Sequence, residues 1–135
     1  MKSFMSKYSS YCYALMRIVA GFLFLWHGAQ KLFGFPSAMP PGVPPFITYI
    51  AGPIELIGGI LIMIGLFTPW AAFLASGLMA SAYWMAHGTK ALLPIQNDGE
   101  LAVIYCFVFL FIASYGGGIW SIDSLVSTGR EKAPD

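Results

Sequence analysis

Charged residues are scarce in this chain of 135 residues, where they make up 10% of the sequence. An average soluble domain contains about 25%. The formal net charge is only +1, which argues against nucleic-acid binding, because that function depends on a strongly basic surface. Hydrophobic residues make up 58% of the chain, more than one small soluble core can bury. The composition therefore favours an all-α membrane protein with the lipid bilayer as its surroundings.

Cysteine is also scarce, with only Cys12 and Cys106 in the chain and no CxxC motif. A small membrane protein that exchanges thiols and disulfides needs a closely spaced reactive pair. The two cysteines are far apart in sequence, at the start of one apolar stretch and in the middle of another. We therefore expect two buried, unreactive thiols and no thiol redox chemistry.

Four long apolar stretches predict four transmembrane helices. Crossing the hydrocarbon layer takes about 20 apolar residues, and the first stretch is too long and too charged for a cleaved signal sequence. Pro53 is expected to kink the second helix, and the Thr68-Pro69 pair predicts a tight turn to the third. The expected fold is a four-transmembrane-helix antiparallel bundle in a single domain, residues 1–127, followed by a loose polar tail, residues 128–135. The spans are expected at about residues 11–33, 46–67, 70–87 and 98–115.

Basic residues give the expected orientation of these spans. With both termini in the cytoplasm, the inside of the membrane holds Lys2, Lys7, Arg130 and Lys132, and the outside holds only Lys31 and Lys90. The positive-inside rule therefore predicts cytoplasmic termini. Aromatic residues mark the two interfaces in this orientation, with Tyr8, Tyr11, Trp70 and Trp120 at the inner one and Tyr49 and Trp84 at the outer one.

The first apolar stretch carries charges and glycines on one face. With a helical period of 100° per residue, this stripe contains Arg17, Gly21, Phe24, Gly28 and Lys31. His27 lies beside it. Charged side chains cannot face lipid without a large cost, so the stripe is expected to face the other helices. The second stretch has a matching stripe of Gly52, Glu55, Gly59 and Ile62, and the third has Ser76, Ala80, Tyr83 and His87.

A rise of 1.5 Å per residue places several ionisable side chains at similar depths. His27, Lys31, Glu55, His87 and Glu100 are all expected in the outward half of the bundle, around one shared pocket. We assign proton-transfer chemistry to Glu55 and His27. The expected substrate- or quinone-binding residues are Lys31, His87, Glu100 and Tyr83, and the expected structural charges are Arg17 and Asp123.

Each of these residues also has a structural interpretation. Glu55 can be a fixed partner of a neighbouring cation, and Lys31 can extend to the interface. Arg17 can be held by Asp123 or by the last carbonyls of the fourth helix. His87 can satisfy carbonyls at a helix end. Glu100 completes an N-x-x-E sequence that resembles a capping box. The sequence alone leaves both interpretations open.

Two histidines on different helices raise the question of a b-type haem. No other haem motif accompanies His27 and His87, so haem is disfavoured. A metal site made of both histidines and Glu55 is equally weakly indicated, and we assign no metal ligands.

The segments RIVAGFLFLWHGAQKLFGF, IELIGGILIMIGLFTPWAA, NDGELAVIY and GGGIWSID together resemble the DoxX family of small bacterial membrane proteins. The matching positions are Arg17, Gly21, Gly28, Lys31, Leu32, Glu55, Gly58, Gly59, Glu100, Gly116, Gly118, Ser121 and Asp123. The sequence departs from the family pattern at the split Asn97-Asp98-Gly99-Glu100 segment and at Gly117, where a proline is usual. The resemblance implies a four-helix, multi-pass protein of the bacterial inner membrane.

The resemblance also implies a redox context, because the related DoxD is similar to the membrane part of a thiosulfate–quinone oxidoreductase. We expect a quinone-linked subunit, or a membrane anchor, for a soluble or membrane-bound redox partner, with quinone as the cofactor. The chain has no redox centre that we recognise, so the partner must supply the electrons, and we leave open whether the chain itself is an enzyme. A proton-coupled carrier of small solutes and a purely structural assembly factor are the alternatives. Assembly into a homo-oligomer also stays open.

Overall fold

The computed structural model describes residues 3–131, and every regular element within them is a helix. The expectation of an all-helical protein is therefore confirmed. A short 3₁₀ turn, Ser6–Tyr8, leads into the first α-helix, and π-helical turns at Ile47–Ala51 and Tyr83–His87 adjoin the second and third. The α-helices in the described residues are α1 (Ser9–Phe33), α2 (Gly52–Ile64), α3 (Thr68–Ala82), α4 (Glu100–Tyr115) and α5 (Ile122–Glu131).

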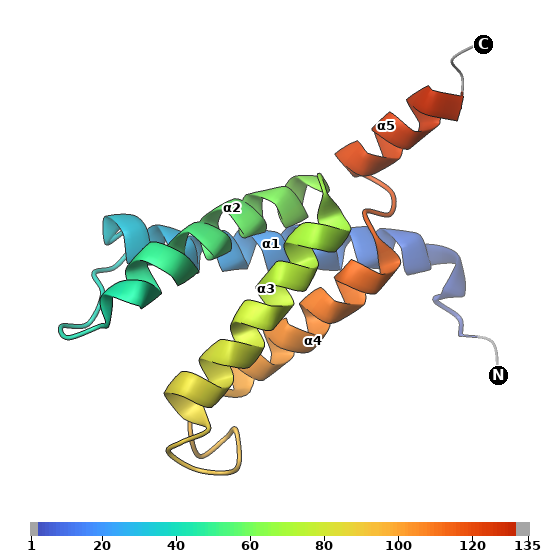
Figure 1. Ribbon diagram of the computed structural model, residues 1–135. Coiled ribbons are helices and arrows are strands. Elements are labelled where there is room, and N and C mark those ends of the chain that lie inside the picture. Colours follow the sequence, from blue (N-terminus) through green and yellow to red (C-terminus); the bar gives the residue numbers. More distant parts are fainter. Residues whose placement is uncertain (1–2, 132–135) are drawn as a thin grey trace.

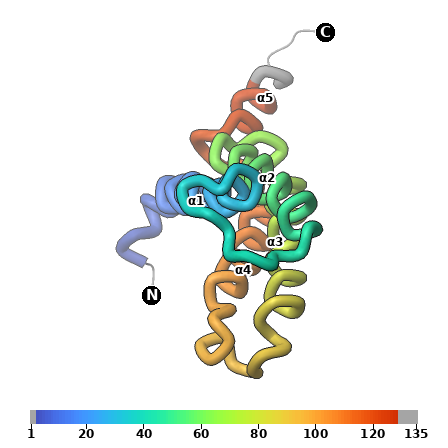
Figure 2. Tube along the Cα trace, turned by 90° about the vertical axis from the view of Figure 1, so that its left-hand side faces the viewer, coloured from blue at the N-terminus to red at the C-terminus, as the bar shows by residue number. Residues whose placement is uncertain are grey.

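The first four helices are arranged as two pairs (Figure 1). Helix α1 packs along α2, and α3 packs along α4, while the contacts between the pairs are fewer. The pairs lie close together near the turn between α2 and α3 and diverge from there (Figures 1 and 2). Helix α5 leaves the same end of the molecule, close to the start of α1. The two pairs therefore share one end and have separate far ends.

Glycines set the close contact between α1 and α2. A methyl group at Gly21 would lie 2.5 Å from the backbone nitrogen of Met63, and one at Gly59 would lie 2.6 Å from that of Leu25. Only hydrogen atoms fit at such positions, so the two backbones touch directly, as small residues allow in membrane helix pairs. The charged and glycine-bearing stripe expected on α1 is the face that meets α2.

The core lies where the two pairs meet. Phe24 of α1 is fully buried, with its ring centroid 4.7 Å from that of Phe109 and 5.5 Å from that of Tyr105, both on α4. Small residues of α3, including Ala72 and Ala75, complete the packing. This aromatic contact joins α1 to α4, as does Tyr13 of α1, whose ring centroid lies 4.1 Å from that of Tyr115.

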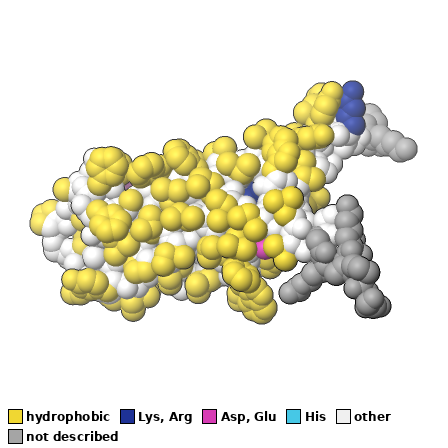
Figure 3. Space-filling view, turned by 90° about the horizontal axis from the view of Figure 1, so that it is seen from above, with side chains coloured by type: hydrophobic (Ala, Val, Ile, Leu, Met, Phe, Trp, Pro, Cys, Tyr) yellow, Lys and Arg dark blue, Asp and Glu magenta, His cyan; other side chains and the backbone are white. Residues whose placement is uncertain are grey.

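Large apolar side chains cover much of the surface, as the space-filling view shows (Figure 3). Patches of this extent are unusual on soluble monomers. Two helical segments are long and apolar enough to cross a membrane, Ser6–Phe33 and Ile47–Ile64, and Glu100–Tyr115 is a shorter apolar helix. The aromatic residues expected at the two interfaces are all exposed: Tyr8, Tyr11, Tyr49, Trp70, Trp84 and Trp120.

Pro53 follows the π-helical turn Ile47–Ala51 within one continuous helical stretch, and that turn is the local irregularity beside it. Two local expectations were wrong. The turn between α2 and α3 lies at residues 65–67, with Gly65 and Phe67 at positive φ, so Thr68 and Pro69 already belong to α3. Cys12 is exposed and only Cys106 is partly buried.

The C-terminal region also differs from the expected loose tail. Helix α5 starts before residue 128 and continues to Glu131, while residues 132–135 lie outside the described residues. Exposed Leu125 and Val126 alternate with serines along it, and that short pattern has too few apolar residues to stand out in the sequence.

Candidate functional site

Arg17 joins the ends of three segments. Its side chain is fully buried, and it donates to the carbonyl oxygens of Ile62 at 2.6 Å and Met63 at 2.8 Å, at the end of α2. A further bond of 2.7 Å reaches the carbonyl of Trp120, after α4. The last carbonyls of a helix lack partners within it and carry partial negative charge. Arg17 therefore bonds the end of α2 and the segment after α4, rather than Asp123 or the last carbonyls of the fourth helix, which were the partners expected from the sequence.

Asp123 closes the same end of the molecule. Its two carboxylate oxygens accept the backbone N–H groups of Phe67 and Thr68, each at 2.9 Å, and its own N–H donates to the carbonyl of Gly65 at 2.9 Å. Burial alone would raise the pKa of Asp123. The hydrogen bonds from Thr68 and Phe67, with the charge of Arg17, outweigh burial and hold that pKa below its usual value. Asp123 thus fastens α5 to the α2–α3 turn.

Lys31 and Glu55 form an ion pair between α1 and α2. The Nζ atom of Lys31 lies 2.5 Å from Oε2 of Glu55, and the two side chains are 15% and 4% exposed. Gly28 and Gly52 bring the backbones together beside the pair, since a methyl group at Gly28 would lie 2.7 Å from the carbonyl oxygen of Gly52. Placing two charges in so dry a position costs free energy, which their contact offsets.

His27 and Tyr105 lie next to this ion pair. Their ring centroids are 6.2 Å apart in an edge-to-face arrangement, and Tyr105 is 7% exposed. His27 lies one helical turn before Lys31 on α1, and Tyr105 approaches His27 from α4. These four side chains, Lys31, Glu55, His27 and Tyr105, form what we call the α1–α2–α4 cluster. It contains an acid, a cation, an imidazole and a phenol.

Tyr105 was missed in the sequence. The signal was present, because Ala102, Tyr105, Phe109 and Ile112 follow the helical spacing of a buried face. A tyrosine on such a face needs a polar neighbour, and the first helix offers several. The residue expected at the site from this apolar stretch was Glu100, which is exposed in the structure.

The remaining expected binding residues lie at the far end of the α3–α4 pair. The Nδ1 atom of His87 is 2.8 Å from the carbonyl oxygen of Asn97, and the hydroxyl of Tyr83 accepts a bond of 3.2 Å from the Asn97 amide. Asn97 is 1% exposed, and its side chain also donates to Ala91 and accepts from the N–H of Gly99. These contacts fix the loop between α3 and α4.

The capping box expected around Glu100 is absent. Helix α4 begins at Glu100 with Gly99 as its N-cap, and no side chain caps it. The side-chain oxygen of Asn97 instead accepts a hydrogen bond from the backbone N–H of Gly99, two residues later, as in an Asx turn. Glu100 is exposed in the first turn of α4, where its negative charge interacts favourably with the positive end of the helix dipole.

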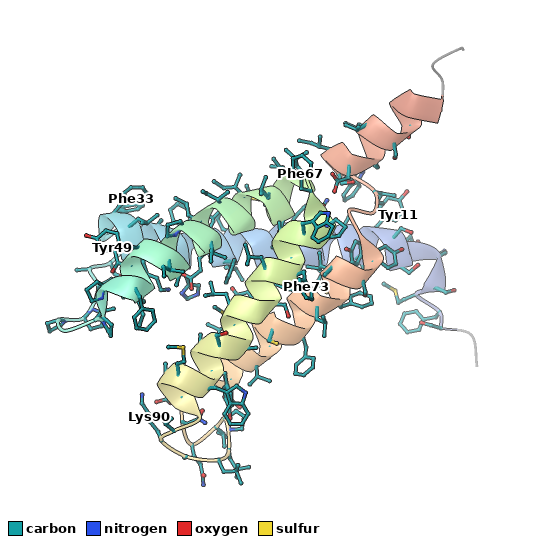
Figure 4. The ribbon with its side chains drawn as sticks, in the orientation of Figure 1. Tyr11, Phe33, Tyr49, Phe67, Phe73 and Lys90 are labelled. Carbon is teal, nitrogen blue, oxygen red and sulfur yellow. The ribbon has the colours of Figure 1, made fainter. Side chains whose placement is uncertain are left out.

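The structure does not bring all five ionisable residues to one pocket. Within residues 3–131 no hydrogen bond or ion pair joins His87 or Glu100 to the α1–α2–α4 cluster. Figure 4 labels Phe33 and Tyr49 at the end of the α1–α2 pair and Lys90 at the separate end of the α3–α4 pair. The prediction of one shared pocket failed because it assumed parallel helices, whereas the pairs diverge. His27 and His87 accordingly face different neighbours, which does not suit axial ligands of one haem.

Comparison with known proteins places the chain in a family. The DoxX family model matches residues 13–88. An uncharacterized protein of Haemophilus influenzae is 39% identical over 126 residues, covering 89% of this chain and 94% of its own length. A Bacillus subtilis protein named "Putative oxidoreductase CatD" is 26% identical over 121 residues, covering 87% and 88%. No solved structure matches the chain. The chain therefore belongs to the DoxX family.

Proposed function

We propose that α1, α2, α3 and α4, with their adjoining π-helical turns, span a bacterial inner membrane as four tilted helices. Family membership and the apolar surface support a membrane location. The start of α1 and helix α5 lie at the same end of the molecule (Figure 1), close to exposed Tyr11 and Trp120, whose ring centroids are 5.4 Å apart. Lys7 lies at this end, and the positive-inside rule makes it the cytoplasmic one. Lys2 and Lys132, which contribute to this assignment, lie outside the described residues.

We further propose that the protein is the membrane component of a quinone-linked oxidoreductase system. The observation that carries this proposal is the α1–α2–α4 cluster, an acid–base group enclosed by apolar helices. A quinone headgroup needs an apolar slot with a hydrogen-bond donor and a proton carrier beside it. The cluster supplies these groups at membrane depth, and the name of the Bacillus subtilis relative supports an oxidoreductase context.

The four side chains have separate tasks in this proposal. Reducing a quinone to a quinol takes two electrons and two protons. A partner oxidoreductase would supply the electrons, and water would supply both protons. Glu55, a carboxylate in its ion pair with Lys31, would take up one of these protons and pass it to the quinone. His27 donates a hydrogen bond to the quinone carbonyl, and Tyr105 holds the imidazole edge-on. Lys31 stabilises the Glu55 carboxylate after proton transfer. His87, Glu100 and Tyr83 have no part in this site.

Quinone content tests the proposal. We expect quinone to co-purify with the protein after mild detergent extraction from bacterial membranes. Glu55→Gln removes the proton carrier and its charge, and should lower the bound quinone about tenfold, which corresponds to about 1.4 kcal/mol. Glu100→Gln is the matched control, because it makes the same change at an exposed carboxylate at the far end of the α3–α4 pair. Protein that carries no quinone and takes up no quinone analogue would refute the proposal, as would equal losses in both variants.

A further inference from the structure

A cavity of about 680 Å³ lies at the end of α1 away from the α1–α2–α4 cluster, between that helix, the segment 116–121 and α5. Four of its lining residues are serines: Ser10, Ser121, Ser124 and Ser127. The proposed function makes no use of this cavity.

Hydrogen-bond acceptors dominate the polar lining. The hydroxyls of Ser124 and Ser127 already donate, at 2.7 and 3.0 Å, to carbonyls of α5 and the residue before it. Ser121 likewise donates to the carbonyl of Gly118 at 2.7 Å. A hydroxyl whose hydrogen already donates to a carbonyl can still accept hydrogen bonds through its lone pairs. These serines therefore present acceptors to anything in the cavity.

Among the side chains that the structure describes, Asp123 adds the only formal charge to the lining. Each of its carboxylate oxygens accepts one backbone N–H, which leaves further lone pairs free, because a carboxylate has about four acceptor sites. No lysine or arginine of residues 3–128 lines the cavity. Arg17 is fully buried and bound to backbone carbonyls. The cavity is therefore suited to a hydrogen-bond donor with positive charge and unsuited to an anion.

Aromatic side chains make up much of the remaining wall, from Tyr13, Tyr115 and Trp120. Aromatic rings attract ammonium groups through their quadrupole, with tryptophan the strongest. The hydroxyl of Tyr13 donates to the carbonyl of Gly116, which holds this ring against the segment after α4. Aromatic rings, hydroxyl lone pairs and one carboxylate together form a setting that suits an ammonium ion.

We propose that this cavity binds a primary ammonium group, supplied by the headgroup of an aminophospholipid such as phosphatidylethanolamine. A primary ammonium has three N–H donors for the serine and carboxylate oxygens, whereas a quaternary ammonium has none. A lipid is the favoured source because exposed Tyr11, Trp120 and Leu125 surround this end with surface suited to the membrane interface. A soluble amine has the same binding chemistry, and the experiment separates the two sources.

Native mass spectrometry tests the proposal. The protein is purified from bilayers that contain equal amounts of phosphatidylethanolamine, phosphatidylcholine and phosphatidylglycerol, and the retained lipids are counted. We expect about tenfold more phosphatidylethanolamine than either of the other two, as the gain of one to two hydrogen bonds implies. Addition of free ethanolamine distinguishes the sources. If ethanolamine binds and no lipid is retained, the ammonium site stands with a soluble ligand.

Two pairs of variants locate the site. Ser127→Leu places a larger side chain in the cavity, and Thr128→Leu is its control. Both hydroxyls are exposed and donate to the carbonyl of Ser124, but only Ser127 lines the cavity. Ser10→Leu and Ser9→Leu form the second pair on α1, and Ser10 makes no side-chain hydrogen bond among the described residues. We expect about a tenfold loss of the lipid in each first variant and no change in its control. Equal retention of the three lipids, or equal losses in variant and control, would overturn the proposal.

Discussion

A methyl group added to Gly28 of α1 would lie 2.3 Å from the backbone nitrogen of Leu56 on α2. Backbone atoms cannot move aside as a flexible side chain can, so Gly28→Ala must push the two helices apart. We expect it to lower the free energy of unfolding by about 1–3 kcal/mol, the usual cost of overpacking. Reversible unfolding in detergent, followed by circular dichroism, measures this loss.

Gly77→Ala is the control for Gly28→Ala. Gly77 is also helical, but a methyl group there meets no atom within 4 Å. Alanine has a higher helix propensity than glycine by about 1 kcal/mol, so this variant should keep or raise the stability. If the two substitutions had the same effect, close contact would not be what holds α1 against α2.

Arg17→Met is expected to cause a larger loss. It removes the donor from the buried bond to the carbonyl of Ile62 and from the partly buried bonds to those of Met63 and Trp120, and a buried group left unsatisfied costs about 1–3 kcal/mol. Arg17→Lys should restore only part of this, because one ammonium cannot reproduce the forked geometry of a guanidinium. The order of stability should be wild type, then Lys, then Met, measured by thermal unfolding. Equal stability of the Lys variant and the wild type would contradict this account.

The sequence predicted the helical class and the buried stripes well, because helical periodicity depends on local spacing alone. Arg17, Gly21, Phe24 and Gly28 are all buried on α1, and Gly52, Glu55, Gly59 and Ile62 are all buried on α2. These two stripes identified faces that meet protein, whereas in the third stripe only Ser76 is buried and Ala80, Tyr83 and His87 are partly exposed. The sequence left open which cation pairs with Glu55, and the structure identifies it as Lys31.

The relative direction of the helix pairs was not predictable in the same way. Depth along one common axis placed His87 and Glu100 beside Lys31, but the axes of the two pairs diverge (Figure 1). Crossing angles depend on how ridges of side chains fit into grooves, which a single sequence does not reveal. Asn97 was missed as an organiser of the loop for a related reason, because its bonds to Tyr83 and Ala91 exist only once α3 and the loop have folded back.

Asp123→Asn should change the pH dependence of stability. The pKa of Asp123 is lower in the folded protein than in the unfolded chain, with hydrogen bonds from Thr68 and Phe67 and the charge of Arg17 overcoming the effect of burial. Its contribution is therefore complete above the unfolded pKa and is lost as pH falls through the folded one. We expect the melting temperature of the wild type to fall more steeply in that acidic range than that of the variant. Parallel curves would show that this carboxylate does not stabilise the fold through its charge.

Asn97→Ala should loosen the loop between α3 and α4 without unfolding the helix pairs. The change removes the donor to the carbonyl of Ala91 and the acceptor for the N–H of Gly99. Hydrogen exchange should speed up for residues 88–99 while the amides in the middle of α1 and α2 keep their protection. Asp98→Ala is the control, because Asp98 is exposed and its side chain makes no hydrogen bond in the part of the chain that the structure describes. Asp98 has a positive φ, so Asp98→Gly serves as a second control without backbone strain.

A double-mutant cycle on Lys31 and Glu55 separates structural from chemical roles. Lys31→Met leaves a carboxylate that is 4% exposed without its cation, and breaking a buried pair from one side costs about 3–5 kcal/mol. Glu55→Leu leaves the Lys31 ammonium without its partner. The loss of stability should be smaller than for Lys31→Met, because Lys31 is more exposed and can turn towards the interface. Replacing both should recover most of the stability, since neither charge then stays unpaired. If the double variant is stable but binds no quinone, the pair has a chemical role beyond fixing the helices; if the two single losses simply add, the ion pair contributes nothing as a pair.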